Sequence, residues 1–588
     1  MRYSDPDQIF VRSTRYTGWF YGMTIKSTRN LIILPSLIIA VLSFLVFILA
    51  ASRYLDVYDE SIIVVGAIRV LNGDLIHRDF WTSYGPGQFY VLAFLFRLFG
   101  ESFLVERIYD AAVRAAIVGA LFYIVRRQCP APIALISTAI VGLWLYGASA
   151  YLYPIFPCML LSLIGSYLVT RVGERPAVPS AIIGAGVCTG LAALFRYDIG
   201  FEILIAHLVA ITVLVWLSYP REARVPRIIK TTMAYCGGTA AGFALVAIAF
   251  LLVAPIGAFF SDVVEYATRY YPMRRLPFPG LLPLSSEEAV YLPLLAGALA
   301  SIQLVPLIRQ RLKATGPQTG GDYSLEYLTV FGIMSCALFA KGIVRVSALH
   351  MLLGIVHAIV VFAVSASLWR ARGAAMRFAS VGLLLFVSLF PASIATRELR
   401  NNLHLKDNSI GGWLAVRVGL IAPSLASSDV CQTGPASGIA KLLPDYARVA
   451  TYLGAHSHAD ERILVGLDRH DKIFANPIGL YFAAGRLPGT HWHEFNPGIQ
   501  TRTDIQAAMV EELQRNKVRW VVRDATFDDV AEPNASALSS GVTVLDRYLD
   551  ENYRPVASSG KVAIWLANGE TPSPAKTIDK CEAQAVER

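Results

Sequence analysis

The sequence is poor in charged residues and lacks the common nucleotide-binding motifs. Of its 588 residues, 16% are charged and 55% are hydrophobic, and the mean hydropathy is +0.50. Soluble domains carry about 25% charged residues, so this composition excludes an ordinary soluble protein. The chain has no G-x-G-x-x-G run, no P-loop and no long internal repeat. Its long apolar runs predict a polytopic α-helical membrane protein.

Apolar stretches long enough to cross a bilayer recur about eleven times along the chain. A further stretch, 88–99, has only about twelve apolar residues, too few to span, so we place it flat on the outer membrane surface. The expected spans are 31–52, 105–126, 131–150, 153–171, 179–195, 199–218, 231–254, 287–308, 325–341, 347–369 and 377–396.

Basic residues predict the orientation of these spans. The N-terminal arm and every second connection after it are basic, beginning with Arg126 and Arg127. Cytoplasmic loops carry an excess of Lys and Arg, so we expect the N-terminus to be cytoplasmic and, with an odd number of spans, the C-terminus to be external. The net charge of +9 reflects this bias and does not indicate nucleic acid.

Three parts are therefore expected: a cytoplasmic amphipathic arm (1–30), a transmembrane domain (31–397) and an extracytoplasmic domain (398–588). In the last part, predicted strands and helices alternate, which is typical of a small α/β domain. Cys431 and Cys581 lie near its two ends, and we expect them to form a disulfide in an oxidising compartment. The expected strands are 462–467, 518–522 and 562–566, and the expected helices are 503–516 and 542–551.

The first outer loop, 53–104, begins with two adjacent acids, Asp59 and Glu60. Carboxylates beside a membrane are costly unless they have a function. Asp59 is the candidate general base, and Glu60 is a candidate to assist it or to hold its geometry. The alternative is that both acids only favour the start of a helix expected at 60–72; one residue can also do both. Other candidates on the loop are Arg78, Asp79 and Tyr84, whereas His77 is expected to be a solvated loop residue.

Cations on the outer side of the later spans are the candidate phosphate ligands. Lys341 and Arg345 lie in one outer connection and Arg196 in another, where basic residues are otherwise scarce. Phosphate would explain them, because Arg binds its oxygens bidentately and Lys acts as a point charge. The alternative is pairing with Asp198 or with lipid headgroups. His350 is expected to be a buried, hydrogen-bonded residue, and Arg269 either contacts an anionic acceptor or is solvated.

The order of these motifs resembles the GT-C superfamily of membrane glycosyltransferases, in particular its protein-mannosyltransferase and lipid A aminoarabinose-transferase branch. The resemblance covers roughly residues 31–400. One departure is Ser83-Tyr84-Gly85, where many relatives have a basic residue before the turn. The shared elements are Asp59-Glu60, the Gly-Asp-x-x-x-Arg-Asp-Phe run at 73–80, the Pro86-Gly87 turn, the Leu-Phe-Gly end of a helix at 98–100, Arg107 at the start of a span, and Lys341, Gly342, Arg345 and His350.

This resemblance implies an inverting enzyme that transfers a hexose or pentose from a polyprenyl-phosphate donor to an envelope glycan, lipid or protein acceptor. It implies that Asp59 is the base and that Lys341, Arg345, Arg78 and Arg196 bind the donor phosphate. Asp79, Tyr84, His350 and Arg269 would support the acceptor. The location would be the bacterial inner membrane, in contact with lipids, with the C-terminal domain in the periplasm.

Three other functions and a bound metal are alternatives. A non-catalytic scaffold or sensor would explain the outer domain but not the acids on the first loop. A transporter or flippase would more often show inverted repeats, and an oligosaccharide ligase would favour a larger outer loop in mid-chain. Some GT-C enzymes use a divalent metal, but the sequence shows no convincing cage. His491, His493 and Glu494 lie close together in sequence, yet two His at i and i+2 on an irregular segment are weak evidence. No cofactor is therefore predicted.

Overall fold

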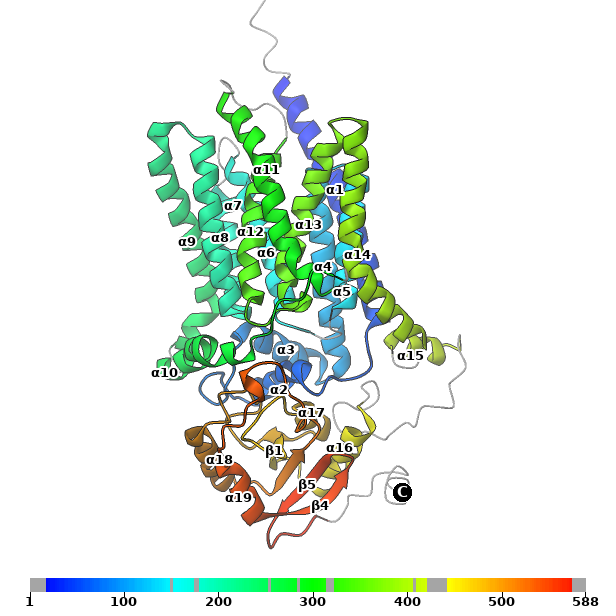
Figure 1. Ribbon diagram of the computed structural model, residues 1–588, viewed down its shortest axis with the longest axis vertical. Coiled ribbons are helices and arrows are strands. Elements are labelled where there is room, and N and C mark those ends of the chain that lie inside the picture. Colours follow the sequence, from blue (N-terminus) through cyan, green and yellow to red (C-terminus); the bar gives the residue numbers. More distant parts are fainter. Residues whose placement is uncertain are drawn as a thin grey trace, which may run out of the picture.

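The computed structural model describes residues 17–148, 152–173, 179–251, 255–282, 286–313, 322–404, 409–419 and 442–573. Within these ranges, a bundle of long helices carries a smaller domain with a β-sheet at one end (Figure 1). The start of α1 lies at the opposite end of the bundle from this domain. Cys431 and Cys581 lie outside the described residues, so their disulfide stays a prediction.

Each of the expected spans coincides with a helix. Among the described residues, eight helical segments are long and apolar enough to cross a membrane, whereas α5 and α7 are apolar but shorter. The bundle consists of α1 (Thr17–Ala50), α4 (Phe103–Arg126), α5 (Ala131–Gly147), α6 (Ile155–Thr170), α7 (Pro179–Phe195), α8 (Tyr197–Ser218), α9 (Arg221–Leu251), α11 (Leu292–Lys313), α12 (Ser324–Phe339), α13 (Ala348–Arg370) and α14 (Ala374–His404). Short 3-10 turns adjoin several of them: η1 (Arg171–Gly173), η4 (Glu288–Tyr291) and η5 (Ala340–Gly342).

The exposed surface of the bundle is apolar, as expected of helices in contact with lipid. On α1, Leu34, Leu37 and Val41 are 58–63% exposed, although water would penalise such a row of side chains. Conversely, α13 is buried along most of its length at the centre of the bundle. This pattern and the apolar helices show an integral membrane protein.

Both ends of the bundle differ from the expected domain boundaries. α1 begins at Thr17, inside the segment expected to be an arm, and α14 continues to His404, past the expected boundary at residue 397. After α14, the short helix α15 (Ile410–Arg417) contacts the end of α1, because Ile410 N donates to Ala51 O at 2.9 Å. The helical part therefore includes α15.

The first loop folds into two short helices at the end of the bundle nearest the C-terminal domain (Figure 1). They are α2 (Asp59–Leu71) and α3 (Pro86–Phe99), close to the helices expected from the sequence. α3 buries Phe89, Leu92 and Phe96 but exposes Phe94, Leu98 and Phe99. A helix that exposes large apolar residues in this place suits a membrane surface.

Gly85 allows the start of α3 to approach the end of α7. Its amide donates to Phe195 O at 3.1 Å, and a Cβ at this position would lie 2.1 Å from Leu194 O. Any other residue would therefore push α3 away from the bundle. A second connection at this end contains α10 (Ile256–Phe259), the π-helix η2 (Phe260–Tyr270) and the 3-10 turn η3 (Tyr271–Arg274).

The C-terminal domain is an α/β domain with a five-stranded sheet of order β2-β1-β3-β5-β4. β1 pairs in parallel with β2 and β3, and the remaining pairs are antiparallel. The expected strands and helices are present, whereas α16, α17, β2 and β4 are additions. The elements are α16 (Pro444–His456), β1 (Arg462–Leu467), α17 (Gly479–Ala484), β2 (Leu487–Pro488), α18 (Thr503–Arg515), β3 (Trp520–Asp524), η7 (Ala535–Ala537), α19 (Val544–Asn552), β4 (Tyr553–Ser559) and β5 (Val562–Ala567).

Segments that follow the carboxyl ends of β1 and β2 contact the first loop. Gly479 N donates to Val57 O at 2.8 Å, and Trp81 N donates to His491 O at 3.2 Å. The Arg69 guanidinium also reaches Thr490 O, at 3.0 Å. In open α/β sheets, ligands bind beyond the carboxyl ends of parallel strands. The C-terminal domain therefore turns the carboxyl edge of its parallel strands towards the bundle.

Candidate active site

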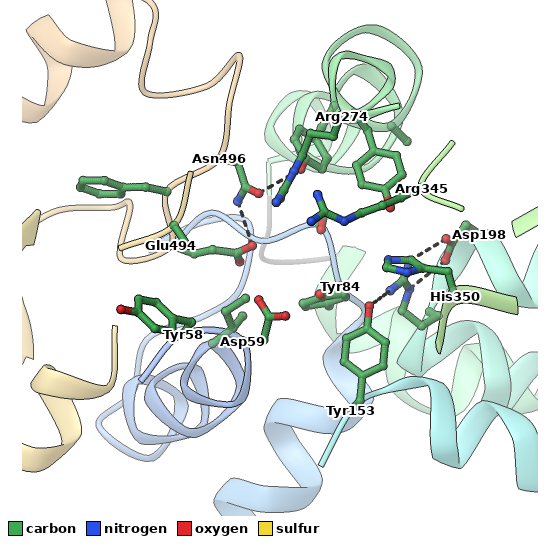
Figure 2. Close-up of a pocket in the computed structure, with 18 of the residues that line it drawn as sticks. Tyr58, Asp59, Tyr84, Tyr153, Asp198, Arg274, Arg345, His350, Glu494 and Asn496 are labelled. Atoms are coloured by element: carbon green, nitrogen blue, oxygen red, sulfur yellow. Dashed lines mark hydrogen bonds and ion pairs between the residues drawn. The ribbon is translucent and has the colours of Figure 1, made fainter. Parts of the chain in front are cut away.

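A cavity of about 180 Å³ lies where the bundle, the first loop and the C-terminal domain meet (Figure 2). Its wall combines acidic, basic and tyrosine side chains from segments far apart in the sequence. The polar and aromatic residues that line it are Tyr58, Asp59, Ser83, Tyr84, Tyr153, Arg196, Tyr197, Asp198, Tyr266, Tyr271, Arg274, Arg345, His350, Phe474, Asn476, Glu494, Phe495 and Asn496.

Asp59 is the first residue of α2 and lines the middle of this cavity. Figure 2 shows its carboxylate pointing towards Tyr84, with Glu494 and Asn496 on the side of the C-terminal domain. An acidic residue suits this position because the N-terminus of a helix favours a negative charge. The structure thus combines the two alternatives for Asp59, because the residue begins a helix and also faces a cavity.

A buried ion network holds the start of α2 against α4. Arg107 donates to Glu60 Oε1, to Glu106 Oε2 at 2.5 Å and to Tyr54 O at 3.1 Å. Glu60 Oε2 also accepts a hydrogen bond from Asp56 N at 2.8 Å. Glu60 is 1% exposed and is not among the residues that line the cavity. Its position suits the second of the two roles that the sequence suggested, which is to hold the geometry beside Asp59.

Arg196 and Lys341 converge on Asp198 at the cavity end of α8. Arg196 binds Asp198 bidentately, with Nε–Oδ1 at 3.0 Å and Nη2–Oδ2 at 2.7 Å, and its guanidinium lies over the Tyr84 ring. Lys341 Nζ lies 3.6 Å from Asp198 Oδ2, but Lys341 itself does not line the cavity. One carboxylate therefore offsets two cations, and positive charge is left near the cavity.

Arg345, Arg274 and His350 line the side of the cavity formed by α13 and η3. Arg345 pairs with Glu532 of the C-terminal domain at 2.7 Å. The buried Arg274 Nε has no hydrogen-bond partner among the described residues. His350 Nδ1 lies 2.7 Å from Ser347 Oγ, so this histidine is hydrogen-bonded as expected, but it is only half-buried and faces the cavity. A buried donor without a partner costs free energy, so Arg274 is the cation best placed to bind an anion.

Glu494 and Asn496 complete the cavity from the C-terminal domain, and sequence reasoning missed both as site residues. Asn496 Nδ2 donates to Glu494 Oε1 at 2.8 Å, and Tyr266 Oη donates to Asn496 Oδ1 at 3.0 Å. Glu494 Oε2 is buried with no hydrogen-bond partner in the described part of the chain. Burial, with the nearby Asp59 charge, raises the pKa of Glu494 to about 7.

Other residues that the sequence singled out lie outside the cavity. Arg78 and Asp79 form a pair with each other at 2.6 Å, and Arg269 is 71% exposed and pairs with Glu265. The expectation that His77 is solvated is wrong. This residue is 2% exposed, has a φ of +61° and lies 2.9 Å from Asp262 Oδ2 through its Nδ1. His77 therefore joins the first loop to η2, which forms part of the cavity wall.

The cavity brings carboxylates and cations together in one wall. Across the ranges that the structure describes, no group of three or more His, Cys, Asp or Glu residues is arranged to hold a metal ion. Asp59 and Glu494 can accept protons or hydrogen bonds, and Arg274, Arg345 and Arg196 can bind an anion. The cavity could thus hold a substrate that has both hydroxyl groups and a phosphate.

Residues 83–253 match the family model described as dolichyl-phosphate-mannose-protein mannosyltransferase. This match confirms the predicted resemblance to GT-C glycosyltransferases, and the matched residues include Tyr84, Tyr153, Arg196 and Asp198 of the cavity. No curated protein is similar enough to this chain to count as a match.

Several solved structures match this chain over most of its length at low sequence identity. One is ArnT from Cupriavidus metallidurans bound to undecaprenyl phosphate, with 13% identity, a TM-score of 0.47, and coverage of 92% of this chain and 99% of that one. Another is the apo oligosaccharyltransferase of Archaeoglobus fulgidus, with 11% identity, a TM-score of 0.43, and coverage of 92% and 75%.

Proposed function

We propose that this chain is an inverting glycosyltransferase that uses a polyprenyl-phosphate sugar and works in the cavity beside Asp59. The family match supports the coarser class, a membrane glycosyltransferase. One observation carries the finer proposal: Asp59 and Arg274 line the same cavity, at the end of the membrane bundle where the C-terminal domain docks. A lipid donor held in the bundle and a polar acceptor could meet there.

In the proposed reaction, Asp59 takes the proton of the acceptor hydroxyl. The acceptor oxygen then forms a bond to the anomeric carbon while the bond from that carbon to the phosphate oxygen breaks. The phosphate leaves with the electron pair, and the configuration inverts. One carboxylate is sufficient because no covalent enzyme intermediate forms, unlike the two-step retaining reaction.

The leaving phosphate needs cations, because negative charge grows on it in the transition state. Arg274 is the first candidate, since its buried Nε lacks a partner among the described residues. Arg345 is the second, because it lines the cavity but already pairs with Glu532. Arg196 lines the cavity but pairs with Asp198, and Lys341 lies outside the cavity lining and supplies positive charge at longer range. Arg78 lies outside the cavity, which disfavours the role expected for it.

Glu494 is placed to bind a sugar hydroxyl. Its Oε1 already accepts from Asn496, and its buried Oε2 lacks a partner among the described residues. A hydroxyl group that donated to Oε2 would satisfy this acceptor. Glu494 would then orient either the transferred sugar or the acceptor opposite Asp59.

The basic connections of the bundle support a matching location. We propose that the N-terminus is cytoplasmic and that the cavity and C-terminal domain face the outside, in the inner membrane of a bacterium. The acceptor would then be an envelope glycan, lipid or protein.

A panel of polyprenyl-phosphate sugars tests this proposal. Purified protein in lipid is given each donor with crude envelope acceptors, and the products are analysed by mass spectrometry and for anomeric configuration. We expect transfer from at least one hexosyl or pentosyl donor, with inversion and release of polyprenyl phosphate. A product with retained configuration, or movement of intact donor lipid between leaflets without transfer, would contradict it.

A further inference from the structure

The C-terminal domain contacts the residue before Asp59 through a chain of hydroxyl groups. Tyr58 Oη lies 2.5 Å from Tyr446 Oη, and Tyr446 donates a hydrogen bond of 2.9 Å to Asp524 Oδ2. Tyr446 is 3% exposed and Asp524 is fully buried. Tyr58 belongs to the first loop, Tyr446 to α16, and Asp524 to the end of β3.

Asp524, the last residue in this series of hydrogen bonds, determines which hydroxyl donates and which accepts. The Asp524 carboxylate only accepts hydrogen bonds, so the Tyr446 proton points to it and the Tyr446 oxygen must accept from Tyr58. The other carboxylate oxygen, Oδ1, accepts from Thr526 N at 2.8 Å and Thr526 Oγ1 at 2.5 Å. Burial raises the pKa of Tyr446 to about 12 and also raises the pKa of Tyr58, so both hydroxyls stay protonated at neutral pH.

The backbone around Tyr58 couples this chain to Asp59. Tyr58 is the N-cap residue of α2 but makes no side-chain cap, and its amide donates to Asp56 Oδ1 at 2.9 Å. Its ring contacts Phe527 of the C-terminal domain, with centroids 5.1 Å apart. Asp59 therefore lies between Tyr58, held by the C-terminal domain, and Glu60, held by Arg107 of the bundle.

We propose that Tyr446 and Asp524 are positioning residues, through which the C-terminal domain fixes the Asp59 carboxylate in the cavity. This inference rests on the proposed function of Asp59 as the base. It gives the C-terminal domain a part in catalysis besides its contribution of Glu494. A displacement of about 1 Å at a reacting group can cost up to about a hundredfold in rate, so loss of the chain should be measurable.

Tyr446→Phe, which removes one hydroxyl, tests the chain. We expect kcat to fall by about fivefold to thirtyfold, with the KM for the donor changed by less than about twofold, because the base moves while the phosphate ligands do not. Tyr58→Phe should give a similar loss, and the double variant should be no worse than either single one, since both break the same chain. If Tyr446→Phe fails to fold, Asp524→Asn replaces it, because an amide nitrogen at Oδ2 would donate and reverse the chain.

Tyr553→Phe is the matched control. Tyr553 is also buried in the C-terminal domain, and its hydroxyl donates to Val518 O at 2.7 Å, away from the first loop. This variant should keep both kcat and KM. Equal losses in Tyr446→Phe and Tyr553→Phe, or an unchanged kcat in Tyr446→Phe, would overturn the positioning role.

Hydrogen exchange separates this inference from the proposed function. In Tyr446→Phe, and not in Tyr553→Phe, amides in the peptide 54–62 should exchange faster, whether or not a sugar is transferred. Faster exchange in a protein without transferase activity would refute the proposed function alone. Unchanged exchange would refute the positioning chain.

Discussion

Glu494 is buried in a place that disfavours the ionised form of its carboxyl group. It is 6% exposed and its pKa is raised to about 7 from the usual value near 4.5, chiefly by burial. A raised carboxyl pKa means that the folded protein binds more protons than the unfolded chain between pH about 4.5 and 7. The stability associated with the protonated form is therefore lost as the pH rises through about 7. Such a group is costly at neutral pH and is typical of functional sites.

Glu494→Gln should therefore separate stability from activity. The amide cannot ionise, so the melting temperature should rise above that of the wild type at pH 8 and stay close to it at pH 5. The amide nitrogen would replace the free Oε2 acceptor, so we expect KM for a sugar substrate to rise by about tenfold. Thermal unfolding at the two pH values and steady-state kinetics measure both effects. An equal change in melting temperature at both pH values would contradict the raised pKa.

Arg274 is the residue that we expect to bind the donor phosphate most directly. Arg274→Ala should weaken binding of a non-hydrolysable polyprenyl-phosphate analogue by about tenfold to a hundredfold, the size of one lost charge-assisted contact. Arg275→Ala is the control, because the neighbouring Arg275 is exposed and does not line the cavity. Equal affinity in the wild type and Arg274→Ala would move the phosphate site towards Arg345 and Arg196.

The short helix α2 shows how elements build the site. Its first residue is the candidate base, its second residue is buried against α4, and Gly479 of α17 packs on the turn before it. A Cβ on Gly479 would lie 2.8 Å from Val57 Cα and 2.6 Å from Ser61 Oγ, so the closeness of α17 requires glycine. The position of Asp59 thus depends on packing between elements from three parts of the chain.

Arg107→Ala tests the contact between α2 and α4. It leaves Glu60 and Glu106 buried without their cation, and breaking a buried ion pair costs about 3–5 kcal/mol. We expect much less folded protein in detergent and a lower melting temperature, measured by fluorescence-detected size exclusion. Arg97→Ala should behave as the wild type, since Arg97 is exposed on α3. Normal stability of Arg107→Ala would show that the network contributes little.

The sequence patterns predicted the helices and strands better than they predicted which of these elements contact one another. The apolar runs located the bundle helices, and the buried run at 462–467 predicted β1 with the bounds that the structure has. β4 was not predicted from the sequence. It is an edge strand with several exposed residues and Pro555, and such strands have a weak apolar pattern. Two-residue β2 is too short for any periodicity.

The site was predicted in part for a related reason. Asp59, Arg345 and His350 belong to motifs that carry the family resemblance, whereas Arg196 was predicted as a cation on the outer side of the bundle and Tyr84 as a residue beside the Pro86-Gly87 turn. Glu494 and Asn496 reach the cavity only because the C-terminal domain docks on the first loop, and no local pattern gives that docking. They follow β2 at the carboxyl edge of parallel strands, where ligands often bind, but β2 itself has no recognisable pattern in the sequence.

At the scale of the whole molecule, the bundle forms one part of the cavity wall and the C-terminal domain forms another. It supplies Glu494 and Asn496 to the wall and pairs Glu532 with Arg345. The start of α1 lies at the other end of the bundle (Figure 1). The proposed orientation therefore has the arm in the cytoplasm and the cavity outside.

Cysteine labelling tests this orientation. An impermeant maleimide applied to intact cells should label Glu551→Cys, an exposed position on α19, and should leave Thr14→Cys unlabelled until the cells are opened. The wild type measures the background from the native cysteines. Labelling of Thr14→Cys in intact cells would invert the orientation and place the cavity in the cytoplasm.

Transfer by Asp59→Asn tests the central claim most directly. The amide keeps the shape of the side chain but cannot accept the acceptor proton, so we predict a loss of at least about a thousandfold in kcat while the affinity for a polyprenyl-phosphate analogue stays within about threefold. Glu101→Gln, which neutralises another carboxylate of the same loop outside the cavity, should transfer at the wild-type rate. Turnover by Asp59→Asn within about tenfold of the wild type would contradict the assignment of Asp59 as the base.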